Sequence, residues 1–163
     1  MKKTTLKPPL GCRTPVPAVP DTNDDDWYGT VQQMFPSWVP LDRVRSVAAG
    51  EHWQAVRTSL LLGERALGCL GKSIGPVIRA PYTAHMVFLL GLNSLSSSSW
   101  KVPGARLLPG GARVEIPPGT IRSGRDVHWA VPPDQGRTDP SALRAALNGQ
   151  PAATTPPPRG KGR

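Results

Sequence analysis

Residues 52–90 read HWQAVRTSLLLGERALGCLGKSIGPVIRAPYTAHMVFLL, and this stretch decides the fold class. Residues 52–58 predict a strand. Residues 59–70 predict an amphipathic helix, which Gly71 and Lys72 end. Its apolar side chains recur at helical spacing on one face: Leu60, Leu61, Ala66, Leu67 and Leu70. A short strand at 76–79, a turn at 81–83 and the most hydrophobic strand at 84–90 follow. The order strand, helix, strand, strand predicts an α+β fold.

Further elements are expected on both sides of this unit. Three strands are predicted at residues 105–108, 112–116 and 126–131, and the Pro109-Gly110-Gly111 turn joins the first two as a hairpin. Residues 93–99 read as a serine-rich loop, residues 35–40 as an irregular aromatic anchor, and residues 41–49 as a short helix. Asp139 is expected to cap a final helix over residues 140–148. We therefore expect a mixed or antiparallel sheet with helices on one face.

The distribution of proline predicts one domain with Pro-rich ends. The 163 residues include 20 prolines and 17 glycines, and the prolines are densest near the two termini. Such segments bury too little apolar surface to offset the entropy of ordering them. We expect disordered segments at residues 1–26 and 151–163, the second of them basic, around a single domain at residues 27–150. All five tryptophans fall inside that domain.

The charge favours an acidic partner, and composition argues against several classes of site. Within residues 27–150, thirteen Lys or Arg face seven Asp or Glu, a surplus that would attract polyanions or simply keep the chain soluble. Cys12 and Cys69 predict neither a disulfide framework nor a zinc site. The longest apolar run, residues 86–92, is too short to span a bilayer. We expect a cytoplasmic protein with no membrane partner and no cofactor.

The sequence contains no complete catalytic or metal-binding motif. Residues 66–73, ALGCLGKS, match a relaxed phosphate-loop spelling, but a helix precedes them and a strand follows, the reverse of what that loop needs. The histidines His52, His85 and His128 have no neighbour at metal-ligand spacing, and the loop serines have no base and orienting acid nearby. His85 lies in the apolar strand, either packed as an ordinary strand residue or directed at a ligand.

Residues 112–120, ARVEIPPGT, and residues 123–129, SGRDVHW, resemble the end of the N-terminal domain of bifunctional primase-polymerases. That family closes its catalytic sheet with a strand, a Pro-Pro turn, a Ser-Gly-Arg hairpin and a Trp strand. The strand around His85 resembles its histidine motif, and residues 53–70 resemble its first catalytic strand and helix. The likeness covers about residues 51–149. It implies that His85 contacts nucleotide.

The resemblance also implies that catalysis has been lost. The family's three metal-binding aspartates fall on Gln54, Arg57 and near Arg106 in this chain. Guanidinium groups repel Mg²⁺ but can pair with phosphate directly. We therefore expect a non-catalytic domain without metal that binds nucleic acid or nucleotide weakly; an active enzyme would need metal ligands that the sequence does not show. The expected ligand-binding residues are Arg57, His85, Arg106, Arg113, Arg122 and Arg125.

A second hypothesis is a small regulatory module whose partner is a protein. Exposed aromatic side chains would form its interaction surface, or the proline-rich ends would serve as ligands. The aromatic candidates are Trp27, Tyr28, Phe35 and Trp38.

Overall fold

The computed structural model describes residues 34–149, which form two antiparallel sheets and two α-helices. The strands are β1 (Arg45–Ala48), β2 (Gln54–Ser59), β3 (Val77–Ala80), β4 (His85–Leu90), β5 (Ala105–Leu107), β6 (Arg113–Ile116) and β7 (His128–Val131). The helices are α2 (Leu60–Leu70) and α3 (Pro140–Leu147), with short 3₁₀ turns at Gly71–Ser73 and Pro81–Thr83. The predicted α+β class is confirmed. The segments expected to be disordered, 1–26 and 151–163, lie outside the described residues.

The main sheet has five strands in the order β5-β2-β4-β3-β7. The consecutive elements β2, α2, β3 and β4 are the predicted strand-helix-strand-strand unit, and β4 lies between β2 and β3. Every pair of neighbouring strands in the sheet is antiparallel. Of the mixed or antiparallel sheets that the sequence allowed, the antiparallel form is the one observed.

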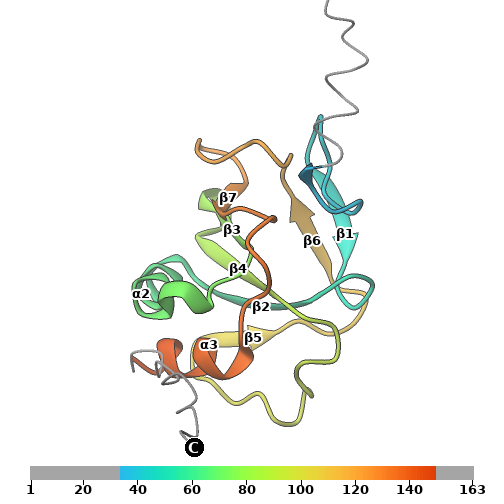
Figure 1. Cartoon of the computed structure of the whole chain (residues 1–163). Coiled ribbons are helices and arrows are strands. Elements are labelled where there is room, and N and C mark those ends of the chain that lie inside the picture. Colours follow the sequence, from blue (N-terminus) through green and yellow to red (C-terminus); the bar gives the residue numbers. More distant parts are fainter. Residues whose placement is uncertain (1–33, 150–163) are drawn as a thin grey trace, which may run out of the picture.

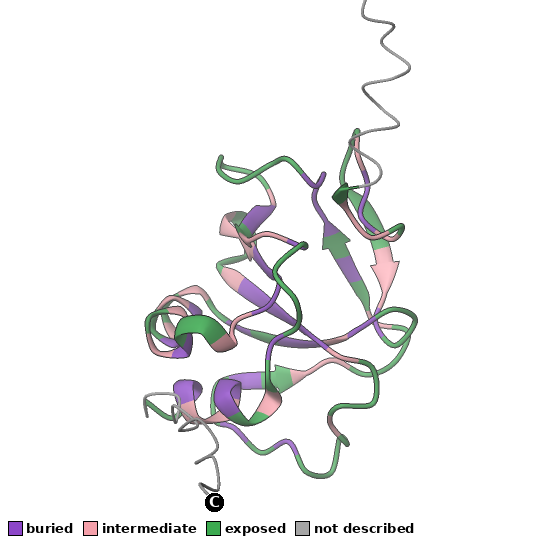
Figure 2. Cartoon of the chain, viewed as in Figure 1, coloured by how far each residue is buried: buried purple, intermediate pink, exposed green. Residues whose placement is uncertain are grey.

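Both faces of this sheet are covered. Helices α2 and α3 lie against one face, and the small β1-β6 sheet lies against the other (Figure 1). Alternate residues of β4 therefore enter two separate cores: Met86, Phe88 and Leu90 join the helix side, while Val87 and Leu89 join the opposite side. Because β4 is buried along its length (Figure 2), its sequence reads as a continuous apolar run instead of an alternating one.

Both helices begin and end close to where the sequence predicted, but one side chain of α2 is exposed where the sequence predicted it to be buried. The Ser59 hydroxyl accepts from the Leu62 N–H at 3.3 Å, and the Asp139 carboxylate accepts from the Ser141 N–H at 3.0 Å, so both helices have side-chain N-caps. Gly71, with φ of 54°, ends α2. Leu61, expected on the apolar face of α2, is instead 75% exposed.

Two expectations about local structure are wrong. Within residues 41–49, expected to be helical, Arg45–Ala48 form strand β1 because they pair with β6 in an antiparallel ladder. Residues 105–108 and 112–116 do not form a hairpin, since β5 pairs with β2 and β6 with β1. The Gly111 N–H donates to the Ala49 carbonyl at 2.8 Å, so the intervening turn carries the chain from one sheet to the other.

The Ser-Gly-Arg segment at residues 123–125 likewise joins no hairpin. It connects β6 to β7, which belong to different sheets. A single backbone hydrogen bond closes this connection, in which the backbone N–H of Trp129 donates to the Ile121 carbonyl at 2.9 Å. In the part of the chain that the structure describes, no helix is long and apolar enough to cross a bilayer.

Candidate functional site

Two arginines meet on the sheet face that lies away from the helices. Arg57 of β2 pairs in register with Arg106 of β5, which is an edge strand. Residues directly opposite in an antiparallel pair have Cβ atoms about 4.5–5.5 Å apart. Side chains alternate between faces along a strand, so Arg57 shares its face with Ala55, which packs in the core away from the helices.

His85 joins the two arginines on this face. In the register of β2 and β4, His85 is opposite Ser59 and Arg57 is opposite Val87, so His85 is the diagonal neighbour of Arg57. Diagonal neighbours on one face lie about 7–8 Å apart, within reach of long side chains. The histidine is half-buried, whereas Arg57 and Arg106 are exposed.

These side chains line two adjoining hollows that share Arg57 and His85. The first, of about 430 Å³, lies between the main sheet and the β1-β6 sheet and has Arg113 and Glu115 on its β6 side. The second, of about 400 Å³, runs along β5 and includes Arg106. We call the two together the arginine cleft. Its first hollow also has an apolar lining: Ile78, Val87, Leu108, Val114 and Val127.

The arginine cleft carries unpaired positive charge. Three arginines and one glutamate line it, and within residues 34–149 none of these arginines forms an ion pair. The ion pairs of the described chain lie elsewhere, such as that of Arg79 with Glu64 of α2. Arg113 is oriented by donating to the Ser46 carbonyl at 3.3 Å. Like charges directly opposite on neighbouring strands are destabilising, so a bound anion would relieve repulsion between Arg57 and Arg106.

Four of the six predicted binding residues come together here: Arg57, His85, Arg106 and Arg113. The other two do not line the cleft. Arg122 and Arg125 are exposed in the connection between β6 and β7 and lie in neither hollow.

Gln54, matched by the resemblance to a metal ligand, has a structural role instead. Gln54 precedes Arg57 by three residues in β2, and side chains alternate between faces along a strand, so the two side chains lie on opposite faces. Its Nε2 donates to the Leu95 carbonyl at 2.8 Å, and its Oε1 accepts from the Leu95 N–H at 2.9 Å and the Ser94 hydroxyl at 3.1 Å. Gln54 thus ties the serine-rich loop to the sheet.

The remaining sequence candidates lie apart from the cleft. His128 is buried, with Nδ1 2.7 Å from the Asp126 carbonyl oxygen. Helix α2 runs into the 3₁₀ turn at Gly71–Ser73 and then β3, so no α-helix begins where the phosphate-loop spelling would require one. Across residues 34–149, no three His, Cys, Asp or Glu side chains gather closely enough to hold a metal ion.

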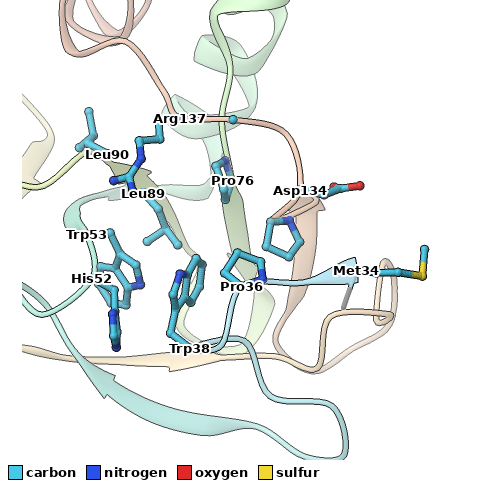
Figure 3. A pocket seen from close by; sticks show the side chains of 12 residues that line it. Met34, Pro36, Trp38, His52, Trp53, Pro76, Leu89, Leu90, Asp134 and Arg137 are labelled. Atoms are coloured by element: carbon cyan, nitrogen blue, oxygen red, sulfur yellow. The ribbon is translucent and has the colours of Figure 1, made fainter. Parts of the chain in front are cut away.

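A second pocket, which sequence reasoning missed, contains aromatic and proline rings. It has a volume of about 370 Å³, and its lining includes Pro36, Trp38, Trp53, Pro76, Pro133 and Arg137 (Figure 3). We call it the Trp–Pro pocket. The ring centroids of Trp38 and Trp53 are 6.1 Å apart, and those of Trp38 and Trp129 are 6.2 Å apart, both edge to face.

The indole N–H of Trp53 is buried, and no acceptor for it lies within the described part of the chain. A buried donor left unpaired costs about 1–3 kcal/mol, so the packing of Trp53 carries a local cost in stability. A pairing of tryptophans with nearby prolines, as in Pro36 and Trp38, is the sequence signal that could have pointed to it.

The aromatic surface expected for a protein partner is not exposed as predicted. Phe35 and Trp38 are half-buried and pack against the core that includes Trp53 and Trp129. Trp27 and Tyr28 lie outside the described residues.

Comparison with known proteins adds no assignment to this geometry. No family model matches the chain, and no curated protein or solved structure matches it either.

Proposed function

We propose that the arginine cleft binds the phosphate groups of nucleic acid or of a nucleotide, in a non-catalytic domain of the primase-polymerase type. The observation that carries this proposal is the pairing of Arg57 with Arg106 across β2 and β5, since within residues 34–149 no carboxylate forms an ion pair with either arginine. His85 and Arg113 extend the same positively charged surface.

Phosphate fits this arrangement for a geometric reason. A guanidinium group presents five N–H donors in a planar fork that matches two phosphate oxygens, and two neighbouring guanidinium groups can share one phosphate. The apolar lining between the main sheet and the β1-β6 sheet, with residues such as Ile78 and Val114, could receive a base. The shared ligand chemistry is therefore a phosphate beside a flat apolar group.

The absence of catalysis is part of the proposal and follows from charge. Phosphoryl transfer needs carboxylates that hold Mg²⁺ on the phosphates. Arg57 and Arg106 stand where the resemblance would put two such ligands, and a guanidinium repels a divalent cation. We expect binding without turnover and with modest affinity, because most of its free energy comes from counterion release.

A fluorescence anisotropy titration tests the proposal. The probe is a fluorescein-labelled single-stranded oligonucleotide, added to the full chain in low-salt buffer. We expect saturable binding that weakens as salt rises, with a log–log slope of about −0.7 for each phosphate contacted. Unlabelled ATP is then added as a competitor. If ATP displaces the oligonucleotide, the cleft binds free nucleotide; if it does not, the cleft binds a nucleic-acid strand only.

The matched variants remove one charge each at different places. Arg57→Gln and Arg106→Gln should each weaken binding and reduce the salt slope, whereas Arg65→Gln, exposed on α2 on the far side of the sheet, should change it little. Equal losses from all three variants would mean that binding reflects net charge alone and would remove the cleft proposal. No binding of oligonucleotide or ATP at low salt would remove the proposed function itself. If a pull-down then recovered a protein partner in stoichiometric amount even after nuclease treatment, the domain would be better explained as a protein-interaction module.

A further inference from the structure

We propose that the Trp–Pro pocket binds the chain's own proline-rich stretch, residues 6–20. This inference is independent of the arginine cleft, since the two sites share no lining residue. It assigns a self-recognition site to the face of the domain where the described chain begins.

The pocket has the chemistry that recognises proline-rich peptides. Such peptides dock in aromatic-lined grooves, where proline rings pack on aromatic faces. The half-buried indole of Trp38 supplies such a face, beside the half-buried ring of Pro36. Trp53 is 2% exposed and packs edge to face against Trp38 at an interplanar angle of 67°, so it supports the Trp38 indole from within the core.

The polar groups of the pocket favour a ligand rich in acceptors. Proline has a carbonyl oxygen but no N–H, so a proline-rich segment carries more acceptors than donors. The pocket supplies such a donor group: the exposed Arg137 side chain lines it, and its guanidinium has no ion-pair partner in residues 34–149. The carbonyl oxygens of a proline-rich peptide therefore complement the Arg137 guanidinium.

The wall that carries Arg137 is fixed in place before any ligand arrives. The neighbouring Thr138 is 2% exposed, accepts from the Gly75 N–H at 3.0 Å and forms a bridge with Leu90. The Arg137 side chain lies over Gly91, since a Cβ added there would be 3.7 Å from its Nη1. Trp38 is likewise held between Trp53 and Trp129. A preformed site loses less entropy on binding than one that must be ordered.

The described chain begins beside the pocket, which points to residues 6–20 as the segment that binds there. Met34, the first described residue, is 65% exposed and lines the pocket itself. Pro20 precedes it by 14 residues, a length that can span at most about 50 Å. Residues 6–20 contain five prolines, and Lys7 and Arg13 can complement the Asp134 carboxylate on the pocket's lining. Tethering places this stretch near the pocket at an effective concentration of about a millimolar.

A spin label on the full chain tests the proposal. Cys12 lies inside residues 6–20, so a nitroxide can be attached there once the other cysteine is removed by Cys69→Ser. We expect selective paramagnetic broadening of the Trp38 and Trp53 indole N–H signals in ¹⁵N-labelled protein. Trp100, whose indole donates to the Ala105 carbonyl in the helix-side core, is the internal reference and should keep its intensity.

The decisive control leaves the described domain untouched. Replacing Pro15, Pro17 and Pro20 together by Ser keeps the tether and the label but removes the recognised rings. We expect the selective broadening of the two indole signals to fall at least severalfold in this variant. Broadening that is absent, equal for Trp100, or unchanged by the proline replacements would overturn the proposal. Broadening seen only when labelled chains are mixed with separate ¹⁵N chains would overturn it in favour of a second copy.

Discussion

Arg57 and Arg106 occupy directly paired positions on the antiparallel strands β2 and β5, and in residues 34–149 neither has a carboxylate partner within ion-pair distance. Two like charges in this relationship repel each other when no anion is bound. The same pairing that would hold a phosphate therefore weakens the unliganded domain. This opposition between stability and binding gives the first prediction.

Arg106→Gln should stabilise the unliganded protein while weakening its oligonucleotide binding. Removing one charge from the pair relieves repulsion, and we expect the free energy of unfolding to rise by about 0.2–1 kcal/mol. Urea unfolding followed by tryptophan fluorescence, in low-salt buffer without phosphate, measures it. Arg65→Gln makes the same charge change away from the cleft and should shift the midpoint less. A loss of stability in Arg106→Gln would show that the two guanidinium groups do not repel.

Gly75→Ala should be strongly destabilising. A Cβ at this position would fall on the backbone of Arg137 and Thr138, which cannot move aside as a flexible side chain could. We expect a loss of about 1–3 kcal/mol or more in the free energy of unfolding. The contrasting variant is Gly68→Ala in α2, where a Cβ meets nothing within 4 Å and helix propensity should add about 1 kcal/mol of stability. Thermal or urea unfolding of both variants should show opposite signs.

Leu143→Ala should cost far more stability than Leu61→Ala. Leu143 of α3 is 0% exposed and packs in the helix-side core, so its truncation should cost about 2–5 kcal/mol. Leu61 of α2 is 75% exposed, and its truncation should change the free energy of unfolding by less than about 0.5 kcal/mol. Chemical unfolding of the two variants checks the pair. Similar losses would mean that Leu61 is buried in solution.

Gln54→Ala should loosen the serine-rich loop without affecting phosphate binding. The substitution removes the acceptor of the Ser94 hydroxyl and the Leu95 N–H as well as the donor to the Leu95 carbonyl, and we expect faster hydrogen exchange at the Leu95 amide. Because Gln54 faces away from Arg57, oligonucleotide affinity should stay within about twofold. A large loss of affinity together with an unchanged Leu95 exchange rate would contradict the structural role given to Gln54.

Asp139→Ala should weaken the start of α3. The Asp139 side chain accepts from the Ser141 N–H at 3.0 Å, and loss of an N-cap typically costs about 1 kcal/mol. Asp139→Asn retains a capping oxygen and should cost much less. Differential scanning calorimetry of the two variants distinguishes the cap from a general effect of charge at this site.

The sequence predicted four residues that line the arginine cleft, but it did not predict where the cleft ends. Arg57, His85, Arg106 and Arg113 were predicted as ligand-binding residues, and the structure brings them to one cleft. Arg122 and Arg125 are equally basic, yet the chain between β6 and β7 holds them outside both hollows. Nothing in local sequence separates the two groups, because which residues share a surface depends on contacts between distant segments.

The sequence alone determined the elements whose signals are local. The β2-α2-β3-β4 unit and helix α3 follow from apolar periodicity, N-caps at Ser59 and Asp139, and the glycine that ends α2. These signals act within a few residues, so they survive without knowledge of the rest of the chain.

The tertiary structure decided which strands pair and which face each side chain occupies. Strand β1 forms only because β6 is there to pair with it, and the turn after β5 sends the chain to another sheet instead of back along β5. Strand register has a period of two, so the partner's position determines whether a residue such as Gln54 meets the helix side or the cleft. Pairing between strands far apart in sequence is a non-local interaction, and the Trp–Pro pocket, built from five separate segments, depends on it in the same way.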